Sequence, residues 1–253
     1  MDVDRDTLIW IYTKMQTIRQ FETRVAELFL EGKLPGTVHL YAGEEAVACG
    51  VCANLGPADY VGSTHRGHGH VIAKGGDLNK MMAELYGKTT GYCKGKGGSM
   101  HIANIGIGVL GANGIVGAGL PIAVGAGFAA KYRKSDAVAV SFFGDGASNQ
   151  GTFHESINLA AVLRVPVIFV CENNGYAIST SQIRHQNITD VADRAAGYGI
   201  PGVVVDGNDA FAVYGAAKEE IGRARAGLGP SLLDCKTYRH YGHSIGDSGR
   251  YRT

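Results

Sequence analysis

This sequence of 253 residues lacks an excess of charge of either sign: 24 Lys and Arg face 23 Asp and Glu, for a formal net charge of +1. A nearly neutral chain has no basic footprint for nucleic acid, so we expect no nucleic-acid partner. The sequence also lacks an apolar run of the roughly 18 residues that a membrane span needs. We therefore expect no membrane partner either.

Cysteine is scarce, and its placement does not suggest a disulfide or zinc framework. Of the five cysteines, only Cys49 and Cys52 are close in sequence, in a CxxC spacing. Their neighbours are small residues typical of a buried helix, and no second Cys or His pair completes a zinc set. Free thiols are typical of a reducing compartment. Because residues 1–4 lack the basic start and apolar core of a signal peptide, we expect a cytoplasmic protein.

Glycine, by contrast, is abundant: 38 of the 253 residues, about twice the average usage. The excess lies in residues 87–127 and around the motifs described below, and it does not form a repeat. Residues 87–112 read as a long loop, which is unusual in a compact domain unless it is functional. Glycines placed in this way fit loops that pass close to a ligand.

The order of elements predicts an α/β fold. Residues 137–143 are apolar on both faces, as a buried parallel strand must be. Residues 149–163 then have helical periodicity, and residues 165–170 read as a second buried strand. A strand–helix–strand unit of this kind is a right-handed crossover, so both strands end at the same edge of the sheet. That edge is where open α/β sheets bind ligands.

The remaining elements predict a three-layer parallel sheet with helices on both faces. A long N-terminal helical arm, about residues 4–31, begins with Asp6 as its cap and ends at Gly32. No linker divides the chain, so we expect residues 1–253 to form one domain. The other predicted helices span 43–55, 78–86, 116–132, 190–198 and 209–226, and the other predicted strands span 60–61, 202–205 and 231–236.

Two motifs follow the two buried strands, Gly-Asp-Gly-Ala at 144–147 and Glu-Asn-Asn-Gly-Tyr at 172–176. Asp145 and Asn174 offer the oxygen ligands that Mg²⁺ prefers, and Tyr176 adds a backbone carbonyl. The glycines beside Asp145 leave room for a phosphate, and a helix starting near Ser148 points its free N–H groups at the same anion. Each motif alone is also ordinary turn chemistry. As a pair separated by one crossover, they predict a site for a divalent cation and a diphosphate.

At this point the sequence resembles a known family. The segment GDGASNQGTFHESINLAAVLRVPVIFVCENNGYA resembles the thiamine-diphosphate motif, and in particular the alpha subunits of thiamine-diphosphate-dependent 2-oxo acid dehydrogenases, the pyruvate and acetoin dehydrogenase group. Five other segments match the same family in the same order: HLYAGEEAVACG at 39–50, STHRGHGH at 63–70, KGKGGSMH at 94–101, GANGIVGAGLPIAVGAG at 111–127 and YRHYGHSIGD at 238–247. The resemblance covers nearly all of the chain.

The resemblance implies further site residues. Arg66 matches the arginine that contacts the cofactor, and His65 precedes it where the family often has Tyr. His39 matches an active-site histidine, although a single His is also a common structural residue. His243 lies in a glycine-rich segment that covers the cofactor in the family, so His39 and His243 are the candidate catalytic residues. The implied cofactor-binding set is Arg66, His65, Gly114, Val116, Asp145, Gly146, Ala147, Asn174, Tyr176 and His243, and the implied metal set is Asp145, Asn174 and Tyr176.

The resemblance also implies chemistry and partners. In this family thiamine diphosphate with Mg²⁺ decarboxylates a 2-oxo acid, and the two-carbon unit passes to a lipoyl acyltransferase. Thiamine enzymes need two α/β domains, and this chain has sequence for only the diphosphate domain. The pyrimidine domain is therefore expected from a beta subunit, in an α₂β₂ assembly.

Three questions stay open at the level of the sequence. The 2-oxo acid is expected to be pyruvate, with an acetoin-cleaving dehydrogenase as the alternative. Family members usually continue past the Tyr-Arg-Thr at 251–253, which predicts a truncated chain and leaves a non-catalytic cofactor-binding chain as another alternative. Ser244 matches a regulatory phosphorylation position of some members, where a phosphate would repel the diphosphate.

Overall fold

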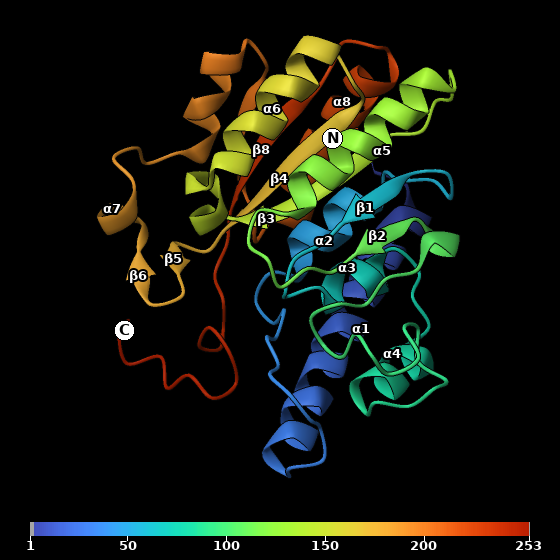
Figure 1. Ribbon diagram of the computed structural model, residues 1–253, viewed down its shortest axis with the longest axis vertical. Helices are drawn as coiled ribbons and strands as arrows, with labels where there is room; N and C mark the ends of the chain where they lie inside the picture. The colour runs from blue at the N-terminus through green and yellow to red at the C-terminus, as the bar shows by residue number, and fades with distance from the viewer. Residues whose placement is uncertain (1–2, 253) are drawn as a thin grey trace.

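The computed structural model describes residues 3–252, and its centre is a parallel sheet of six strands. Every neighbouring pair in this sheet runs in parallel. Figure 1 shows the strands fanning across the upper half of the molecule. In spatial order they are β2 (Val109–Gly111), β1 (Tyr60–Gly62), β3 (Ala139–Gly144), β4 (Val167–Asn173), β8 (Ser231–Lys236) and β7 (Gly202–Asp206).

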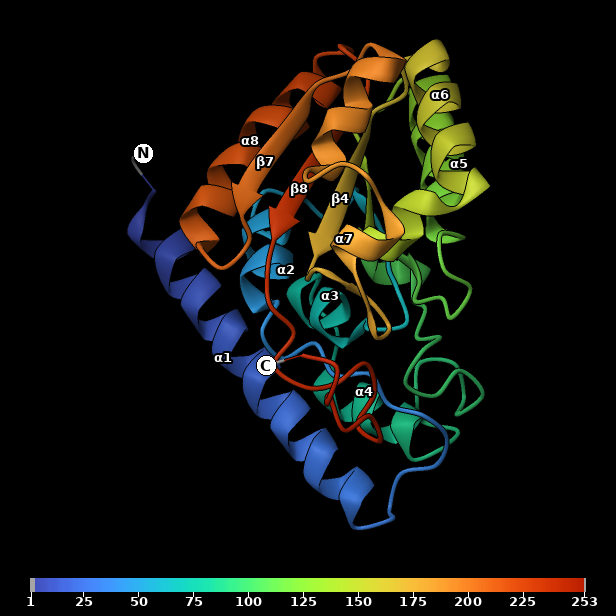
Figure 2. The same ribbon diagram turned by 90° about the vertical axis from the view of Figure 1, so that its left-hand side faces the viewer.

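Helices cover both faces of the sheet, as predicted. Helices α5 (Gly119–Tyr132) and α6 (Gly151–Leu163) lie side by side on one face. Helices α2 (Glu45–Cys52) and α8 (Ala210–Arg225) pack together on the other, and α1 (Arg5–Leu30) lies across α2. Figure 2 shows the sheet between α8 on one side and α5 and α6 on the other. The expectation of a three-layer α/β fold is confirmed.

Strand residues alternate between two apolar cores. In β3, Val140 and Phe142 pack on the α2 and α8 side, whereas Phe143 packs under α5 and α6. In β4, Val170 joins the first core and Phe169 the second. Side chains of a strand point to opposite faces in turn, so a strand buried on both sides must be apolar throughout. This alternation explains why the sequence shows unbroken apolar runs at these positions.

The start of the N-terminal helix differs from the prediction. The N-cap of α1 is Asp4, whose side chain accepts a hydrogen bond from the amide of Thr7 at 2.9 Å, so the prediction of Asp6 as cap is wrong. The other observed helices are α3 (His68–Ala73), α4 (Leu78–Leu85), α7 (Gln182–His185) and three 3₁₀ segments, Ile105–Ile107, Asp145–Asn149 and Val191–Tyr198.

The short strand expected at 60–61 is present as β1, but other short elements were not predicted. The loop expected at 87–112 contains β2, which adds an edge strand to the sheet. After β4 the chain forms a two-stranded hairpin of β5 (Tyr176–Ala177) and β6 (Thr180–Ser181). A strand of two or three residues carries little periodicity, so a sequence pattern often does not reveal it.

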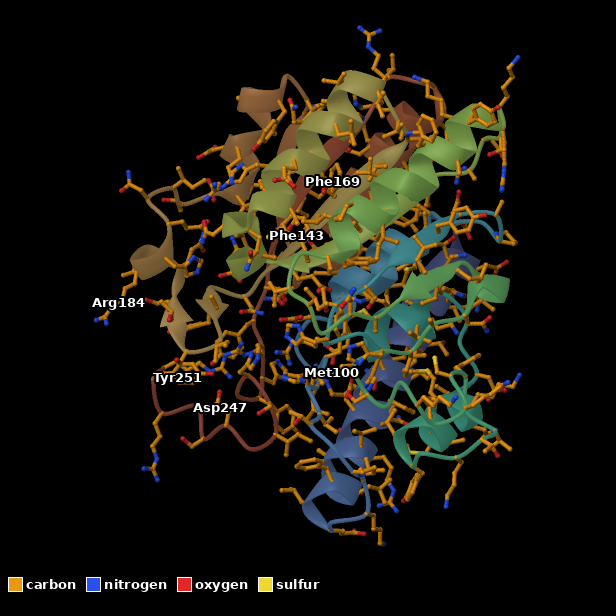
Figure 3. The ribbon with its side chains drawn as sticks, viewed as in Figure 1. Met100, Phe143, Phe169, Arg184, Asp247 and Tyr251 are labelled. Atoms are coloured by element: carbon orange, nitrogen blue, oxygen red, sulfur yellow. The ribbon has the colours of Figure 1, made fainter. Side chains whose placement is uncertain are left out.

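The segment after β8 returns across the carboxyl edge of the sheet. The amide of Thr237 donates to the carbonyl of Asn173 at 2.9 Å, and the amide of Ile245 donates to the carbonyl of Val38 at 3.1 Å. Figure 3 shows Asp247 and Tyr251 close together in this segment, and the Tyr251 hydroxyl donates to the Asp247 carboxylate at 2.6 Å. Among residues 3–252, no helix is long and apolar enough to cross a membrane.

A stability measurement tests the core under α5 and α6. Phe169 is fully buried there, with 0% of its surface exposed. We expect Phe169→Ala to lower the free energy of unfolding by about 3–5 kcal/mol, because the truncation removes apolar contact and leaves a cavity. Ile183, which is 88% exposed, is the matched control, and Ile183→Ala should change stability by less than about 0.5 kcal/mol. Urea unfolding followed by circular dichroism measures both values, and equal losses would contradict this description of the core.

Candidate active site

The pairing of β3 with β4 brings the two sequence motifs together. Gly144, the last residue of β3, pairs with Glu172 near the end of β4. Asp145 and Asn174 therefore leave the sheet at neighbouring positions of one edge. Both line a single cavity of about 290 Å³. Of the predicted site residues, this cavity is lined by His65, Arg66, Val116, Asp145, Gly146, Ala147, Asn174, Tyr176 and His243.

The acidic part of the cavity fits a small hard cation. Asp145 is 1% exposed, and burial raises the pKa of its carboxyl, opposed by its contact with His185. The Nε2 atom of His185 lies 3.1 Å from Asp145 Oδ2, which leaves the other carboxylate oxygen for a further ligand. Asn174 directs its Nδ2 to Glu44 and accepts a 3.3 Å hydrogen bond from the amide of Tyr176 at its Oδ1. A buried carboxylate beside an amide oxygen is a donor set of the kind that Mg²⁺ uses.

The two glycines beside Asp145 have different roles. A Cβ at Gly144 would come no closer than 4.0 Å to its nearest neighbour, so this position leaves open space. A Cβ at Gly146 would lie 2.7 Å from the Cβ of Ala177. Gly146 is therefore needed so that the turn after β3 can pack on the β5–β6 hairpin. The space beside Gly144 is open and that beside Gly146 is filled by Ala177, while room for a phosphate near these glycines stays a prediction.

The chain after Asp145 does not enter an α-helix at once. Residues Asp145–Asn149 form a 3₁₀ turn, and α6 begins at Gly151. Ser148 is buried, and its hydroxyl donates to the carbonyl of Asp145 at 2.7 Å. The prediction of an α-helix starting near Ser148 is therefore wrong by about one turn of helix. The 3₁₀ turn tightens the loop against the cavity, where Gln150 becomes a lining residue.

Two arginines supply the positive charge of the cavity. Arg66 is 4% exposed, and its guanidinium donates to the carbonyl oxygens of Leu40 and, at 3.0 Å, of His243. Arg239, which the sequence analysis did not single out, also lines the cavity and is 1% exposed. Its Nη2 donates to Ile178 O at 2.9 Å, while its Nε has no hydrogen-bond partner among residues 3–252. A buried guanidinium with an unused donor fits a binding site for an anion.

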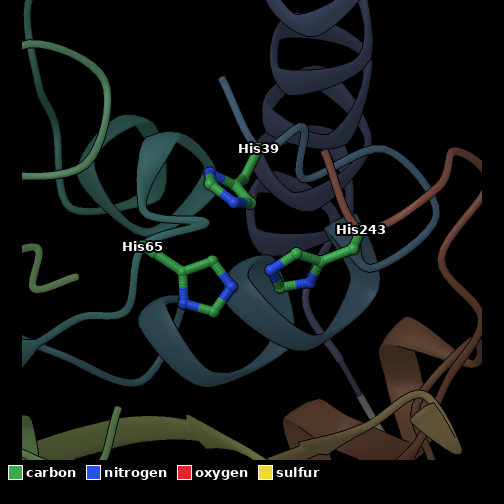
Figure 4. Close-up of side chains that lie close together, drawn as sticks. All are labelled: His39, His65 and His243. Carbon is green, nitrogen blue, oxygen red and sulfur yellow. The ribbon is translucent and has the colours of Figure 1, made fainter. Parts of the chain in front are cut away.

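Three histidines lie close together near Arg66, and Figure 4 shows their side chains. His39, His65 and His243 come from three distant parts of the chain, yet their ring nitrogens lie within 4.8 Å of one another. Burial, followed by the charge of Arg66, lowers the pKa of His39 to about 3, that of His65 to about 2 and that of His243 to about 4. All three rings are therefore neutral at pH 7.

A metal ion is a poor fit for this histidine cluster. In a tetrahedral zinc site with Zn–N distances of about 2.0–2.1 Å, the ligand nitrogens lie about 3.3 Å from one another. The ring nitrogens of this cluster are spread over up to 4.8 Å. The positive charges that repel a proton from these rings repel a dication as well. The Nδ1 of His39 is buried without a partner among the described residues. Neutral imidazoles of this kind suit the oxygen atoms of a small organic ligand, because each ring offers one donor and one acceptor.

Two predicted residues lie outside the cavity wall. Gly114 does not line the cavity, although its neighbours Asn113 and Ile115 do, and its amide donates to His101 Nε2 at 3.3 Å. His39 does not line the cavity, but it packs against His65 and His243, which do; its ring centroid lies 4.8 Å from each of theirs. Ser244 is partly buried next to His243.

The sequence analysis did not recognise a buried acidic network in the wall of the cavity. Glu172 accepts from the Tyr41 hydroxyl and lies 2.7 Å from His70 Nε2. The Nδ1 of His70 lies 2.8 Å from the hydroxyl of Ser63. Glu44 and Glu172 both line the cavity, and burial together with the charge of Glu172 raises the pKa of Glu44 to about 8. The sequence analysis placed Glu172 at the start of the Glu-Asn-Asn-Gly-Tyr motif but gave it no role, whereas in the structure it is a buried residue of β4 (Val167–Asn173).

The depressed pKa of His65 gives a prediction for stability against pH. Below about pH 6.5 an unfolded imidazole takes up a proton, but folded His65 does not do so until about pH 2. The unfolded state then binds more protons, so the free energy of unfolding falls as the pH falls, by up to about 1.4 kcal/mol per pH unit for one group. We expect His65→Gln to make this fall less steep between about pH 6 and pH 4. Chemical denaturation across this range measures the slope, and an unchanged slope would contradict the neutral state of His65.

Known proteins resemble this chain over its whole length. The alpha subunit of acetoin:2,6-dichlorophenolindophenol oxidoreductase from Bacillus subtilis (strain 168) is 59% identical over 253 residues, which are 100% of this chain and 76% of that relative. The protein of the same name from Cupriavidus necator is 58% identical over 252 residues, again 100% of this chain and 76% of the relative. The pyruvate dehydrogenase E1 component subunit alpha of Zymomonas mobilis is 47% identical over 251 residues, which are 99% of this chain and 71% of the relative.

A family profile agrees with these similarities. The profile of the dehydrogenase E1 component matches residues 13–253, which include every residue of the cavity described above. Members of this family use thiamine diphosphate. The chain therefore belongs to the dehydrogenase E1 component family.

Proposed function

We propose that this chain is the alpha subunit of an acetoin-cleaving dehydrogenase that works with thiamine diphosphate and Mg²⁺. The observation that carries the proposal is the joining of the two sequence motifs at one cavity, beside two buried arginines. Acetoin is favoured over a 2-oxo acid because two acetoin-type alpha subunits are 59% and 58% identical to this chain, against 47% for a pyruvate-type subunit.

The metal and the diphosphate would be held by different sides of the cavity. Asp145, the Oδ1 of Asn174 and the backbone carbonyl of Tyr176 would hold Mg²⁺, with phosphate oxygens and water completing its shell. Arg66 and Arg239 would face the phosphates. When bound, thiamine diphosphate supplies the carbon nucleophile that attacks a carbonyl group of the substrate. The residues of this chain would hold the anion and the cation on opposite parts of the site.

The histidine cluster would meet the substrate. Because all three rings are neutral, each can donate one hydrogen bond and accept another, and each can pass a proton. His39 and His243 remain the candidate catalytic residues, with His65 beside them. A cluster without charge of its own suits acetoin, which is an uncharged hydroxyketone, so its hydroxyl and carbonyl oxygens would be held by imidazole groups.

The assembly would include a second chain. The sheet of this chain carries the diphosphate motifs, and we propose that a beta subunit supplies the pyrimidine-binding domain, in an α₂β₂ assembly. A lipoyl acyltransferase would then accept the two-carbon unit. We expect the purified chain alone to show no turnover, and addition of a beta subunit to restore it. Normal turnover by the chain alone would contradict the proposed division of the site.

Pyruvate is the second candidate substrate. It is supported by the pyruvate dehydrogenase relative at 47% identity and by His243-Ser244, which resembles pyruvate-type members. We expect the reconstituted complex to reduce 2,6-dichlorophenolindophenol faster with acetoin than with pyruvate, judged by kcat/KM for each. A higher kcat/KM for pyruvate would overturn the choice of substrate and leave the cofactor site unaffected.

Removal of Asp145 tests the metal site directly. We expect Asp145→Ala to abolish Mg²⁺-dependent binding of thiamine diphosphate, because no other carboxylate follows β3 in the Gly-Asp-Gly-Ala turn. Isothermal titration calorimetry with and without Mg²⁺ measures this binding. Asp193, an exposed carboxylate on the 3₁₀ segment Val191–Tyr198, provides the control, and Asp193→Ala should bind as the wild type does. Normal binding by Asp145→Ala would show that the metal assignment is wrong.

A further inference from the structure

Glu44 is a buried carboxyl in the wall of the cavity. It is the residue before α2, and its backbone is held in a turn by two hydrogen bonds, to Tyr41 O at 3.1 Å and from Val47 N at 3.0 Å. Its side chain is 1% exposed and lines the cavity. One carboxyl oxygen accepts from Asn174 Nδ2 at 2.8 Å, and the other lies 4.0 Å from Arg66 Nε. The carboxyl of Glu44 is therefore hydrogen-bonded to Asn174 and only loosely paired with Arg66.

The side-chain amide of Asn174 has two unlike ends. The NH₂ group is a donor that repels a cation, and the oxygen is an acceptor that can ligate one. In the structure the NH₂ group is taken by Glu44, while the oxygen accepts a longer bond, 3.3 Å, from the amide of Tyr176. Because an amide oxygen has two lone pairs, one stays free for a further ligand. Both contacts select the same orientation of the amide, and the stronger of the two comes from Glu44.

We propose that Glu44 is a positioning residue that fixes the amide of Asn174 so that its oxygen, and not its NH₂ group, is offered to the metal. The inference rests on the proposed function, since it assumes that Asn174 ligates Mg²⁺. A carboxyl oxygen accepts this hydrogen bond whether or not the carboxyl is protonated. Without Glu44 only the longer contact with the amide of Tyr176 favours this orientation, and only one of the two orientations of the Asn174 amide can bind a cation. Groups that orient a metal ligand in this way commonly change metal affinity by about 10–100-fold.

This role differs from two simpler ones. If Glu44 served mainly to pair with Arg66, its loss would weaken the binding of diphosphate with and without Mg²⁺. If Glu44 only filled space in the fold, a residue of similar volume would replace it. The proposed role predicts instead that an acceptor at this position is needed, and only while residue 174 is an amide.

The test is a mutant cycle between positions 44 and 174. Calorimetry measures the Mg²⁺ concentration needed for half-maximal binding of thiamine diphosphate. The sample is the purified protein, together with any subunit that purifies with it. We expect Glu44→Ala and the bulkier Glu44→Met to raise this concentration about 10–100-fold. Glu44→Gln, which keeps an acceptor, should stay close to the wild type. In the Asn174→Asp background, where both ends of the side chain are oxygens, Glu44→Ala should cause no loss of Mg²⁺ affinity.

Glu45 provides the matched control. It is buried beside Glu44, but its carboxylate pairs with Arg19 at 2.5 Å and does not line the cavity. Glu45→Ala should lower the melting temperature without changing the Mg²⁺ requirement. Equal losses for Glu44→Ala in the wild-type and Asn174→Asp backgrounds, or for Glu44→Gln and Glu44→Ala, would overturn the inference. If the wild type binds thiamine diphosphate without needing Mg²⁺, the proposed function fails in its metal site, which is a separate result.

Discussion

The parallel register between β3 and β4 is the constraint on which the site depends. Gly144 pairs with Glu172, so the turns that carry Asp145 and Asn174 begin at the same edge of the sheet. Both strands are buried on both faces, and their side chains alternate between two cores. A slip of one residue would exchange every side chain between those cores. The packing of the sheet therefore sets the separation of the two candidate metal ligands.

The same edge gathers buried polar groups that would be costly elsewhere. Asp145, Glu172, Glu44, Arg66 and Arg239 are each at most 4% exposed. Burying such groups is tolerable only where hydrogen bonds or opposite charges compensate for lost water. Glu172 has Tyr41 and His70, and Glu44 has Asn174. Asp145, Glu44 and the Nε of Arg239 are compensated only in part, since burial still raises the pKa of both carboxyls. This incomplete compensation is what a bound cation and a bound anion would remove.

The sequence predicted the parts of this site that lie close together along the chain. The crossover from β3 to β4 joins neighbouring segments, so its periodicity and its two glycine-rich turns could be recognised. Arg239 and Glu44 are different, because they reach the cavity only through the folding of distant segments. Glu172 lies within the otherwise apolar strand β4. Position 146 requires a glycine because a Cβ there would clash with the side chain of Ala177. Contacts of this kind carry no local pattern, so Arg239 and Glu44 were recognised only from the structure.

The C-terminal segment shows how the fold completes the cavity from a distance. The side chain of Asp247 accepts hydrogen bonds from the backbone amides of His243, at 2.6 Å, and Gly249, at 2.9 Å. These local hydrogen bonds stabilise the loop conformation of the segment. The guanidinium of Arg66, which follows β1, donates a hydrogen bond to the carbonyl of His243 in this C-terminal segment. A residue expected to face the diphosphate thus also positions the backbone of a candidate catalytic histidine. An anion bound at Arg66 would therefore be coupled to the placement of His243 through one guanidinium group.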